Sequence, residues 1–116
     1  KQKIPYVIPS IKKKLKTSKK KIIFENMNHY RDFLNTRDIV SAINILRKKE
    51  KEGIYNIGSG QKFYLKNVVK IFNKNKKQII FKDNFKPTFL ISNNKKIKKL
   101  NWKPTKFNND INYFYK

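Results

Sequence analysis

The stretch HYRDFLNTRDIVSAINILRKKEKEGIYNIGSG, residues 29–60, decides the expected fold of this chain. It begins with an Arg-Asp-Phe triplet, continues through a periodic apolar segment, and ends with Gly-Ser-Gly after a run of β-forming residues. The triplet places a charged guanidinium just ahead of a helical pattern, and the glycines permit a tight turn just after a strand pattern. Both positions are places where a chain can meet an anion or simply change direction.

Apolar residues recur at helical spacing after Asp38, which predicts an amphipathic helix with Asp38 as its N-cap and an end near Gly53. The predicted apolar face consists of Ile39, Ala42, Ile43 and Leu46. Further helices are predicted around residues 8–15, 65–72, 93–100 and 107–114, and strands at residues 22–24, 53–58 and 78–81. Because strands and helices alternate, we expect an α/β or mixed α+β fold.

Length and composition restrict the class of protein. A chain of 116 residues is expected to form one domain, and 38% hydrophobic residues suffice for a modest core. The absence of cysteine excludes disulfides and thiolate metal sites and fits a reducing compartment, so we expect a cytoplasmic location. No apolar run approaches the roughly 20 residues that span a bilayer, so we expect no membrane partner.

The formal net charge of +23 raises the alternative of a basic nucleic-acid-binding module. However, only Arg31, Arg37 and Arg47 of the 30 basic residues are arginine, the side chain suited to bidentate recognition. The lysines accompany abundant Asn, Ile, Phe and Tyr, which is typical of an A/T-rich coding sequence. We therefore favour incidental basicity, although so positive a surface attracts polyanions and sugar-nucleotide phosphates at low salt.

Three segments, RDFLNTRDIVSAINIL, GIYNIGSGQKFYLKNVVKIF and KKLNWKPT, follow one another with VIP and IIF upstream. This order resembles the C-terminal part of extended short-chain dehydrogenase/reductases, the NAD(P)-dependent nucleotide-sugar epimerases, dehydratases and 4-reductases. The resemblance spans about Ile4 to Pro104. It implies that residues 1–116 are a single partial domain, the substrate-binding portion of a Rossmann-type enzyme of deoxysugar or surface-polysaccharide biosynthesis, without the nucleotide-binding half.

The family's cofactor and catalytic motifs are missing from this sequence. Gly53, Gly58 and Gly60 do not form the Gly-rich nucleotide-binding turn, and no tyrosine has a lysine four positions later. We therefore predict no catalytic, cofactor-binding or metal-binding residues here and no activity of the chain alone, although NAD(P) is implied for full-length relatives. The Gly-Ser-Gly segment is interpreted as a structural turn rather than a phosphate loop, and His29, the single histidine, as exposed.

The resemblance also implies substrate contacts. Arg31 of the Arg-Asp-Phe motif is predicted to bind the diphosphate of a nucleoside-diphosphate sugar, because a guanidinium can fork onto phosphate oxygens. The alternative is a surface ion pair of Arg31 with Asp32 or Glu25. The other predicted substrate contacts are Ile22, Ile23 and Phe24 along the base, Tyr6 and Val7 beside the nucleotide, and Lys82 as a second cation.

Some of these positions depart from the family pattern. Tyr6 replaces a polar amide found in some members, and Lys82 stands where an arginine is expected, with Asn84 and Phe85 in place of glycine and aspartate. A separate cofactor-binding half or a homo-oligomer is a further expected partner, whereas nucleic acid is not expected. Besides the nucleic-acid module, an inactive truncated remnant is the remaining alternative.

Overall fold

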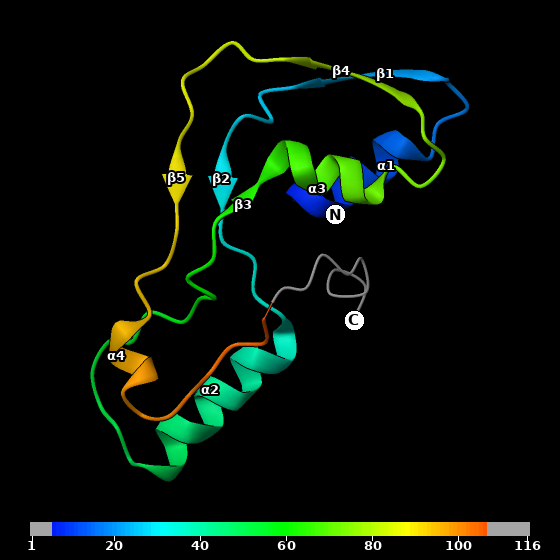
Figure 1. Cartoon of the computed structure of the whole chain (residues 1–116). Coiled ribbons are helices and arrows are strands. Elements are labelled where there is room, and N and C mark those ends of the chain that lie inside the picture. Colours follow the sequence, from blue (N-terminus) through cyan, green and yellow to red (C-terminus); the bar gives the residue numbers. More distant parts are fainter. Residues whose placement is uncertain (1–5, 107–116) are drawn as a thin grey trace, which may run out of the picture. The chain divides into compact units, whose positions relative to one another are not determined.

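The computed structural model describes residues 6–106, in which the chain forms four helices and five short strands (Figure 1). The helices are α1 (Val7–Leu15), α2 (Thr36–Lys48), α3 (Leu65–Phe72) and α4 (Lys95–Lys98). The strands are β1 (Lys21–Glu25), β2 (Tyr30–Arg31), β3 (Phe63–Tyr64), β4 (Gln78–Lys82) and β5 (Phe89–Leu90). The expected mixed α/β class is confirmed, and the helix predicted at residues 107–114 lies outside the described residues.

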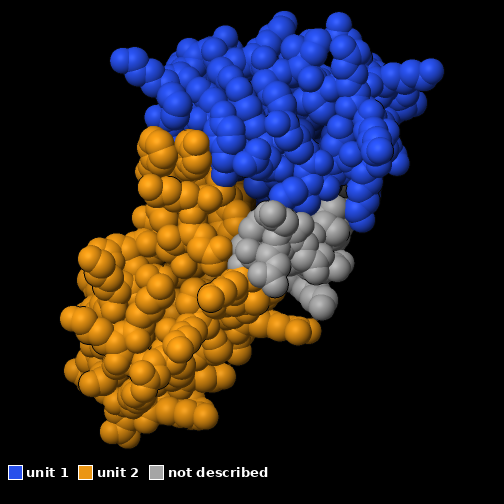
Figure 2. Space-filling model, viewed as in Figure 1, with its two compact units in different colours: residues 1–29, 64–88 blue, residues 30–63, 89–116 orange. Residues whose placement is uncertain are grey.

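The chain divides into two compact units, each built from two separate stretches of sequence (Figure 2). Unit 1 comprises residues 1–29 and 64–88, and unit 2 comprises residues 30–63 and 89–116. The chain therefore enters unit 2 from unit 1, returns, and enters unit 2 again. The single partial domain expected over residues 1–116 stays a prediction.

Unit 1 consists of a parallel strand pair with two helices. β1 pairs with β4 in a register that places Ile22 beside Ile79 and Phe24 beside Phe81. Burial alternates along β1, because successive side chains of a strand point to opposite faces, and Ile22 and Phe24 point inward. α1 contacts α3, whose buried face consists of Leu65, Val68, Val69 and Phe72. All four elements predicted for this unit are present.

Unit 2 contains a small three-stranded sheet in the order β3-β2-β5 and a separate core formed by α2 and α4. β2 and β5 are parallel, and the rings of Tyr30 and Phe89 stack with centroids 4.6 Å apart. The core is built on Ala42 of α2, Ile97 of α4 and the indole of Trp102, each at most 1% exposed. The partly buried hydrophobic residues around it are Leu34, Ile45, Leu46, Tyr55 and Ile57.

The start of α2 differs from the prediction. Asn35, not Asp38, is the N-cap: its backbone is extended and its side chain accepts a hydrogen bond from the Arg37 amide at 2.9 Å. Asp38 lies inside the first turn and is only 7% exposed. Its carboxylate is engaged by Thr105, whose amide and hydroxyl both donate to it at 2.9 Å. The sequence pattern did not show this distant partner.

The strand predicted at residues 53–58 is absent. The carbonyl of Ile54 accepts a hydrogen bond from Lys96 Nζ at 2.8 Å, and that of Gly58 accepts one from Asn94 Nδ2 at 2.9 Å. Side chains near α4 therefore occupy backbone acceptors that a sheet would otherwise use, and no strand within residues 6–106 pairs with this segment.

The apolar face predicted for α2 is only partly buried. Ala42 is buried, but Ile39 is 38% exposed and Ile43 is 53% exposed. The helix turns its Asp38–Ala42 side toward the core, which leaves Ile39, Val40 and Ile43 on the surface of unit 2. None of the helices within residues 6–106 has the length and apolar character that crossing a membrane requires.

Candidate functional site

The carboxylate of Asp32 is the centre of the Gly-Ser-Gly turn. Asp32 Oδ1 accepts hydrogen bonds from the amide of Ser59 at 3.0 Å and from its hydroxyl, and Oδ2 accepts from the amides of Gly60 at 2.8 Å and Ser92 at 3.2 Å. Consecutive turn amides form a concave site for an anion. Here the chain supplies that anion itself, an arrangement expected of a structural turn.

Glycine is required at the two positions of the turn for different structural reasons. A Cβ at Gly58 would lie 2.3 Å from Ser92 Cβ and 3.0 Å from Asp32 Oδ2, so no larger residue fits there. Gly60 has a φ of +71°, a backbone conformation that favours glycine. Close approach to the carboxylate therefore explains the first glycine, and backbone conformation explains the second.

Arg31 lies on β2 between two residues that are held in place. Its Nη1 donates to the carbonyl of Tyr30 at 2.7 Å, and the side chain is half-buried. On one flank the Tyr30 ring stacks on Phe89, and on the other the Asp32 amide donates to the Leu90 carbonyl at 3.2 Å. The position of the backbone at Arg31 is thus fixed from both sides.

The predicted base-contacting strand β1 has two faces of different accessibility. Ile22 and Phe24 are 6% and 1% exposed, whereas Ile23 is 39% exposed. The Phe24 ring tilts against Phe81 with centroids 6.4 Å apart, and Lys14 Nζ lies 5.0 Å from its centre. Phe24 and Ile22 therefore serve as core residues, and the predicted contact of the Phe24 ring with a base is not supported by its burial.

The remaining predicted residues lie at the ends of elements in unit 1. Tyr6 is 64% exposed and precedes α1, Val7 begins α1 half-buried, and Lys82 ends β4 exposed, opposite Glu25 in the strand register. Of the predicted substrate contacts, six belong to unit 1, and Arg31 belongs to unit 2. Their roles in binding stay predictions.

His29 is half-buried rather than exposed, which corrects the prediction. Its Nδ1 lies 3.0 Å from the hydroxyl of Thr88 and accepts a hydrogen bond from the Thr88 amide at 3.1 Å. Within residues 6–106 no group of three or more histidine or acidic side chains is arranged to hold a metal ion. The imidazole therefore has a structural contact within unit 1.

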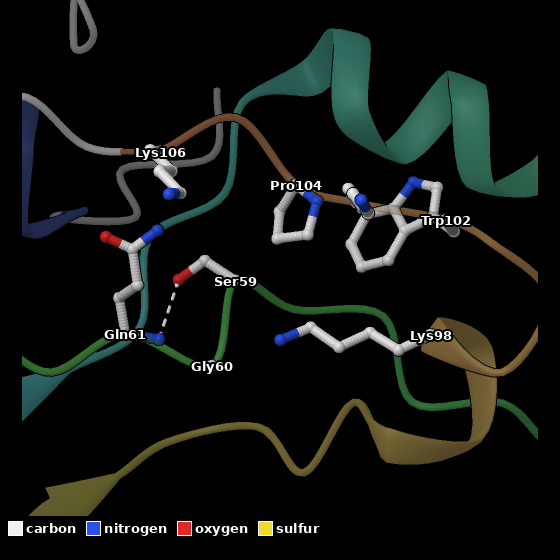
Figure 3. Close-up of a pocket in the computed structure, with 8 residues that line it drawn as sticks. Ser59, Gly60, Gln61, Lys98, Trp102, Pro104 and Lys106 are labelled. Atoms are coloured by element: carbon white, nitrogen blue, oxygen red, sulfur yellow. Dashed lines mark hydrogen bonds between the residues drawn. The ribbon is translucent and has the colours of Figure 1, made fainter.

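A cavity that the sequence did not predict lies in unit 2 (Figure 3). Its volume is about 660 Å³, and it is lined by the turn at residues 59–61, by Lys98 of α4, and by residues 102–104 and Lys106. The Trp102 indole is fixed because its Nε1 donates to the Ser41 hydroxyl at 3.0 Å and lies 3.2 Å from the Asp38 carbonyl. Lysine is so abundant in this chain that its spacing gave no signal for this site.

The residues present do not fit the diphosphate of a dinucleotide at the glycine turn. The amides of Ser59 and Gly60 donate to Asp32, and the amide of Gln61 donates to the Ser59 hydroxyl at 3.1 Å. A phosphate at this turn would have to displace an internal carboxylate. We therefore assign no cofactor role to the turn and derive no redox step from it.

The fold is mixed α/β, and its Gly-Ser-Gly turn is closed on the carboxylate of Asp32. The model of the NAD dependent epimerase/dehydratase family matches residues 1–58, which is half of the 116-residue chain, and the chain belongs to this family. No curated protein sequence matches the chain significantly.

Among solved structures, the chain is similar to RMD from Pseudomonas aeruginosa, whose structure was determined in complex with NADPH. The TM-score is 0.74 at 19% sequence identity, and the match covers 90% of this chain and 39% of RMD. At this identity the likeness shows the fold alone. The chain spans well under half the length of this neighbour.

Proposed function

We propose that this chain is the substrate-binding C-terminal part of an NAD(P)-dependent nucleotide-sugar epimerase, dehydratase or 4-reductase of the extended short-chain dehydrogenase/reductase type. The main support is the coverage of the RMD fold, which includes most of this chain but only 39% of RMD. The Gly-rich cofactor turn and the Tyr-x-x-x-Lys pair, which the sequence lacks, would belong to the uncovered remainder. The proposed setting is cytoplasmic deoxysugar or surface-polysaccharide biosynthesis.

In this proposal Arg31 binds the diphosphate of a nucleoside-diphosphate sugar. Its neighbours support this role, because stacking of Tyr30 and the hydrogen bonds of Asp32 fix the backbone on both flanks before a ligand arrives. A preorganised guanidinium loses less conformational entropy on binding two phosphate oxygens. Asp32 acts on the turn and not on the substrate.

The cofactor-binding half is the proposed partner, and the surface of unit 2 supports it. Val40 is 52% exposed, Ile43 is 53% exposed and Ile54 is 84% exposed. The segment at residues 53–58 also has a strand-like sequence, although no strand within residues 6–106 pairs with it. Exposed apolar side chains and unused strand-forming sequence are both features that a second body would cover.

A binding experiment tests the role of Arg31. The purified chain is titrated calorimetrically with UDP, GDP, CDP and dTDP at about 150 mM salt, where long-range attraction is screened beyond roughly 8 Å. Arg31→Gln should weaken binding of the preferred diphosphate by about tenfold or more, as expected for loss of a charge-assisted contact. Arg37→Gln removes the same charge from the exposed start of α2 and should change affinity less than about threefold.

Equal losses in the two variants would refute a specific role for Arg31. The purified chain should also show no oxidation or reduction of NAD(P)(H) with any nucleotide sugar, and measurable turnover would refute the assignment as a part without its cofactor half. Retention on heparin above about 0.5 M salt together with protection of a defined RNA would favour the nucleic-acid alternative. Absence of binding to every diphosphate would favour an inactive remnant.

A further inference from the structure

The cavity of unit 2 has a positive lining on several sides. Three of its lining residues, Lys98, Lys103 and Lys106, carry ammonium groups, and no carboxylate is among the lining residues that fall within 6–106. Lys98 comes from α4 and Lys106 from the segment after Trp102, and Figure 3 shows the two approaching the turn at residues 59–61 from different sides. Cations that converge on one space repel one another unless an anion occupies it.

The hydrogen bonds around the cavity indicate which donor groups are available to an anion there. The amides of Ser59 and Gly60 donate to Asp32, and the Ser59 hydroxyl also donates to that carboxylate. The lysine ammonium groups are therefore the charged donors at the cavity. Since each ammonium has three donors and a flexible stem, lysine binds a phosphate as a point charge.

We propose that this cavity binds the phosphate group of a small phosphorylated molecule. A monoanionic carboxylate would leave most of the charge of three ammonium groups uncompensated, whereas a phosphate monoester carries about −1.5 to −2 at pH 7. A volume of about 660 Å³ is within the range of small-molecule sites, roughly 300–1,000 Å³. The site does not include Arg31 and does not depend on the proposed function.

The walls distinguish this cavity from the general positive charge of the surface. Half-buried Pro104 provides a ring surface, and the Trp102 indole behind the lining is held by two hydrogen bonds and is only 1% exposed. A second cavity, of about 470 Å³ in unit 1, is lined by residues 18–20 and 75–78. It contains four lysines, Lys19, Lys20, Lys76 and Lys77, and the part of its lining that the structure describes has no ring residue, which makes it a matched control.

The single tryptophan makes the site directly observable. Because Trp102 is the only tryptophan of the chain and lines the cavity, its fluorescence reports occupancy there. The full chain is titrated with inorganic pyrophosphate at about 150 mM salt, followed by Trp102 emission and by calorimetry. We expect a saturable change in emission that Lys98→Gln/Lys106→Gln weakens by about tenfold or more. The charge-matched Lys19→Gln/Lys76→Gln should shift the midpoint less than about twofold.

Further variants keep the test decisive. Lys98→Arg/Lys106→Arg retains both charges and should restore most of the binding, and circular dichroism confirms that each variant is folded. Equal weakening by the two glutamine pairs would show attraction by net charge alone and overturn the proposal. An emission change produced equally well by a single-stranded oligonucleotide, or no saturable change with pyrophosphate, would also overturn it.

Discussion

Both units have an apolar core, but in unit 2 two carboxylates, one of them buried, also join segments far apart in the sequence. Phe24 of β1 and Val68 and Val69 of α3 are at most 1% exposed. In unit 2 the Asp32 carboxylate receives hydrogen bonds from residues 59–60 and 92, and Asp38 receives them from Thr105. Apolar packing tolerates many arrangements, but each polar contact requires one particular partner.

The difference has a consequence for where a site can form. Unit 1 is stabilised mainly by burial of apolar area, which is non-directional, although the Thr88 amide also donates to His29 there. Unit 2 uses directional hydrogen bonds to fix the backbone beside Arg31 and the indole that lines the cavity. Each proposed binding feature of unit 2 therefore lies next to a hydrogen-bonded polar group, which we call a polar anchor: Asp32 beside Arg31, and Ser41 beside the Trp102 indole of the cavity.

The largest effect is expected from removing a core side chain of unit 1. Phe24→Ala should lower the free energy of unfolding by about 3–5 kcal/mol, because the Phe24 ring is buried and its removal leaves a cavity. Ile23→Ala, on the opposite and 39% exposed face of β1, should cost less than about 1.5 kcal/mol. Hydrogen exchange of residues 21–25 and 65–72, monitored at increasing urea concentrations, measures the loss of unfolding free energy in both variants. Similar losses in the two variants would contradict the alternation of burial along β1.

The second effect concerns the polar anchor of unit 2. Asp32→Ala removes the acceptor of four hydrogen bonds from Ser59, Gly60 and Ser92, and should lower the free energy of unfolding by about 2–4 kcal/mol. Trp102 fluorescence during urea unfolding gives this value for unit 2. Asp83→Ala, a carboxylate of the same charge in a surface ion pair, should cost at most about 1 kcal/mol.

If Asp32→Ala were no more destabilising than Asp83→Ala, the carboxylate would not hold the turn. Hydrogen exchange supplies a second readout, because loss of the anchor should expose the amides of Ser59, Gly60 and Ser92 first. If hydrogen exchange instead increased equally in both units, the Asp32 carboxylate would not stabilise unit 2 in particular.

The sequence predicted unit 1 well for a physical reason. Its helices bury stripes at three- and four-residue spacing, such as Leu65 with Val68 and Phe72, and β1 alternates between inside and outside. Such patterns are local and can be read without knowledge of the fold. All four predicted elements of this unit are present, and their ends shift by at most one residue.

Unit 2 was predicted less well because its contacts are distant. Asp38 has the residue type of an N-cap but binds Thr105, which lies 67 positions further along the chain. The strand predicted at residues 53–58 meets side chains of Lys96 and Asn94 instead of another strand. The apolar stripe of α2 correctly predicted a helix, but periodicity does not show which part of a stripe meets the core.

The two candidate sites also differ in how far the sequence could predict them. Arg31 was predicted from the resemblance of its motif, whereas the burial of Phe24 shows that a residue matching such a motif can belong to the core instead. The lysine-lined cavity depends on Lys98 and Lys106, which no local pattern distinguishes from the many other lysines. Only the geometry around Trp102 brings them together.

The smallest effect concerns a surface pair in unit 1. Lys66 Nζ lies 2.5 Å from Asp83 Oδ2, and this hydrogen bond raises the pKa of Lys66 above its usual 10.5. Because the folded pKa is higher than the unfolded one, the stabilisation is fully present below about pH 10.5 and is lost as pH rises through the raised pKa.

Urea unfolding between pH 8 and about pH 12 should therefore show the native chain losing a small advantage in unfolding free energy over Lys66→Gln. Lys70→Gln removes the same charge from the same helix without that hydrogen bond, so it should follow the native chain. Parallel curves for the native chain and Lys66→Gln would show that solvent screening removes the pair's contribution to unit 1.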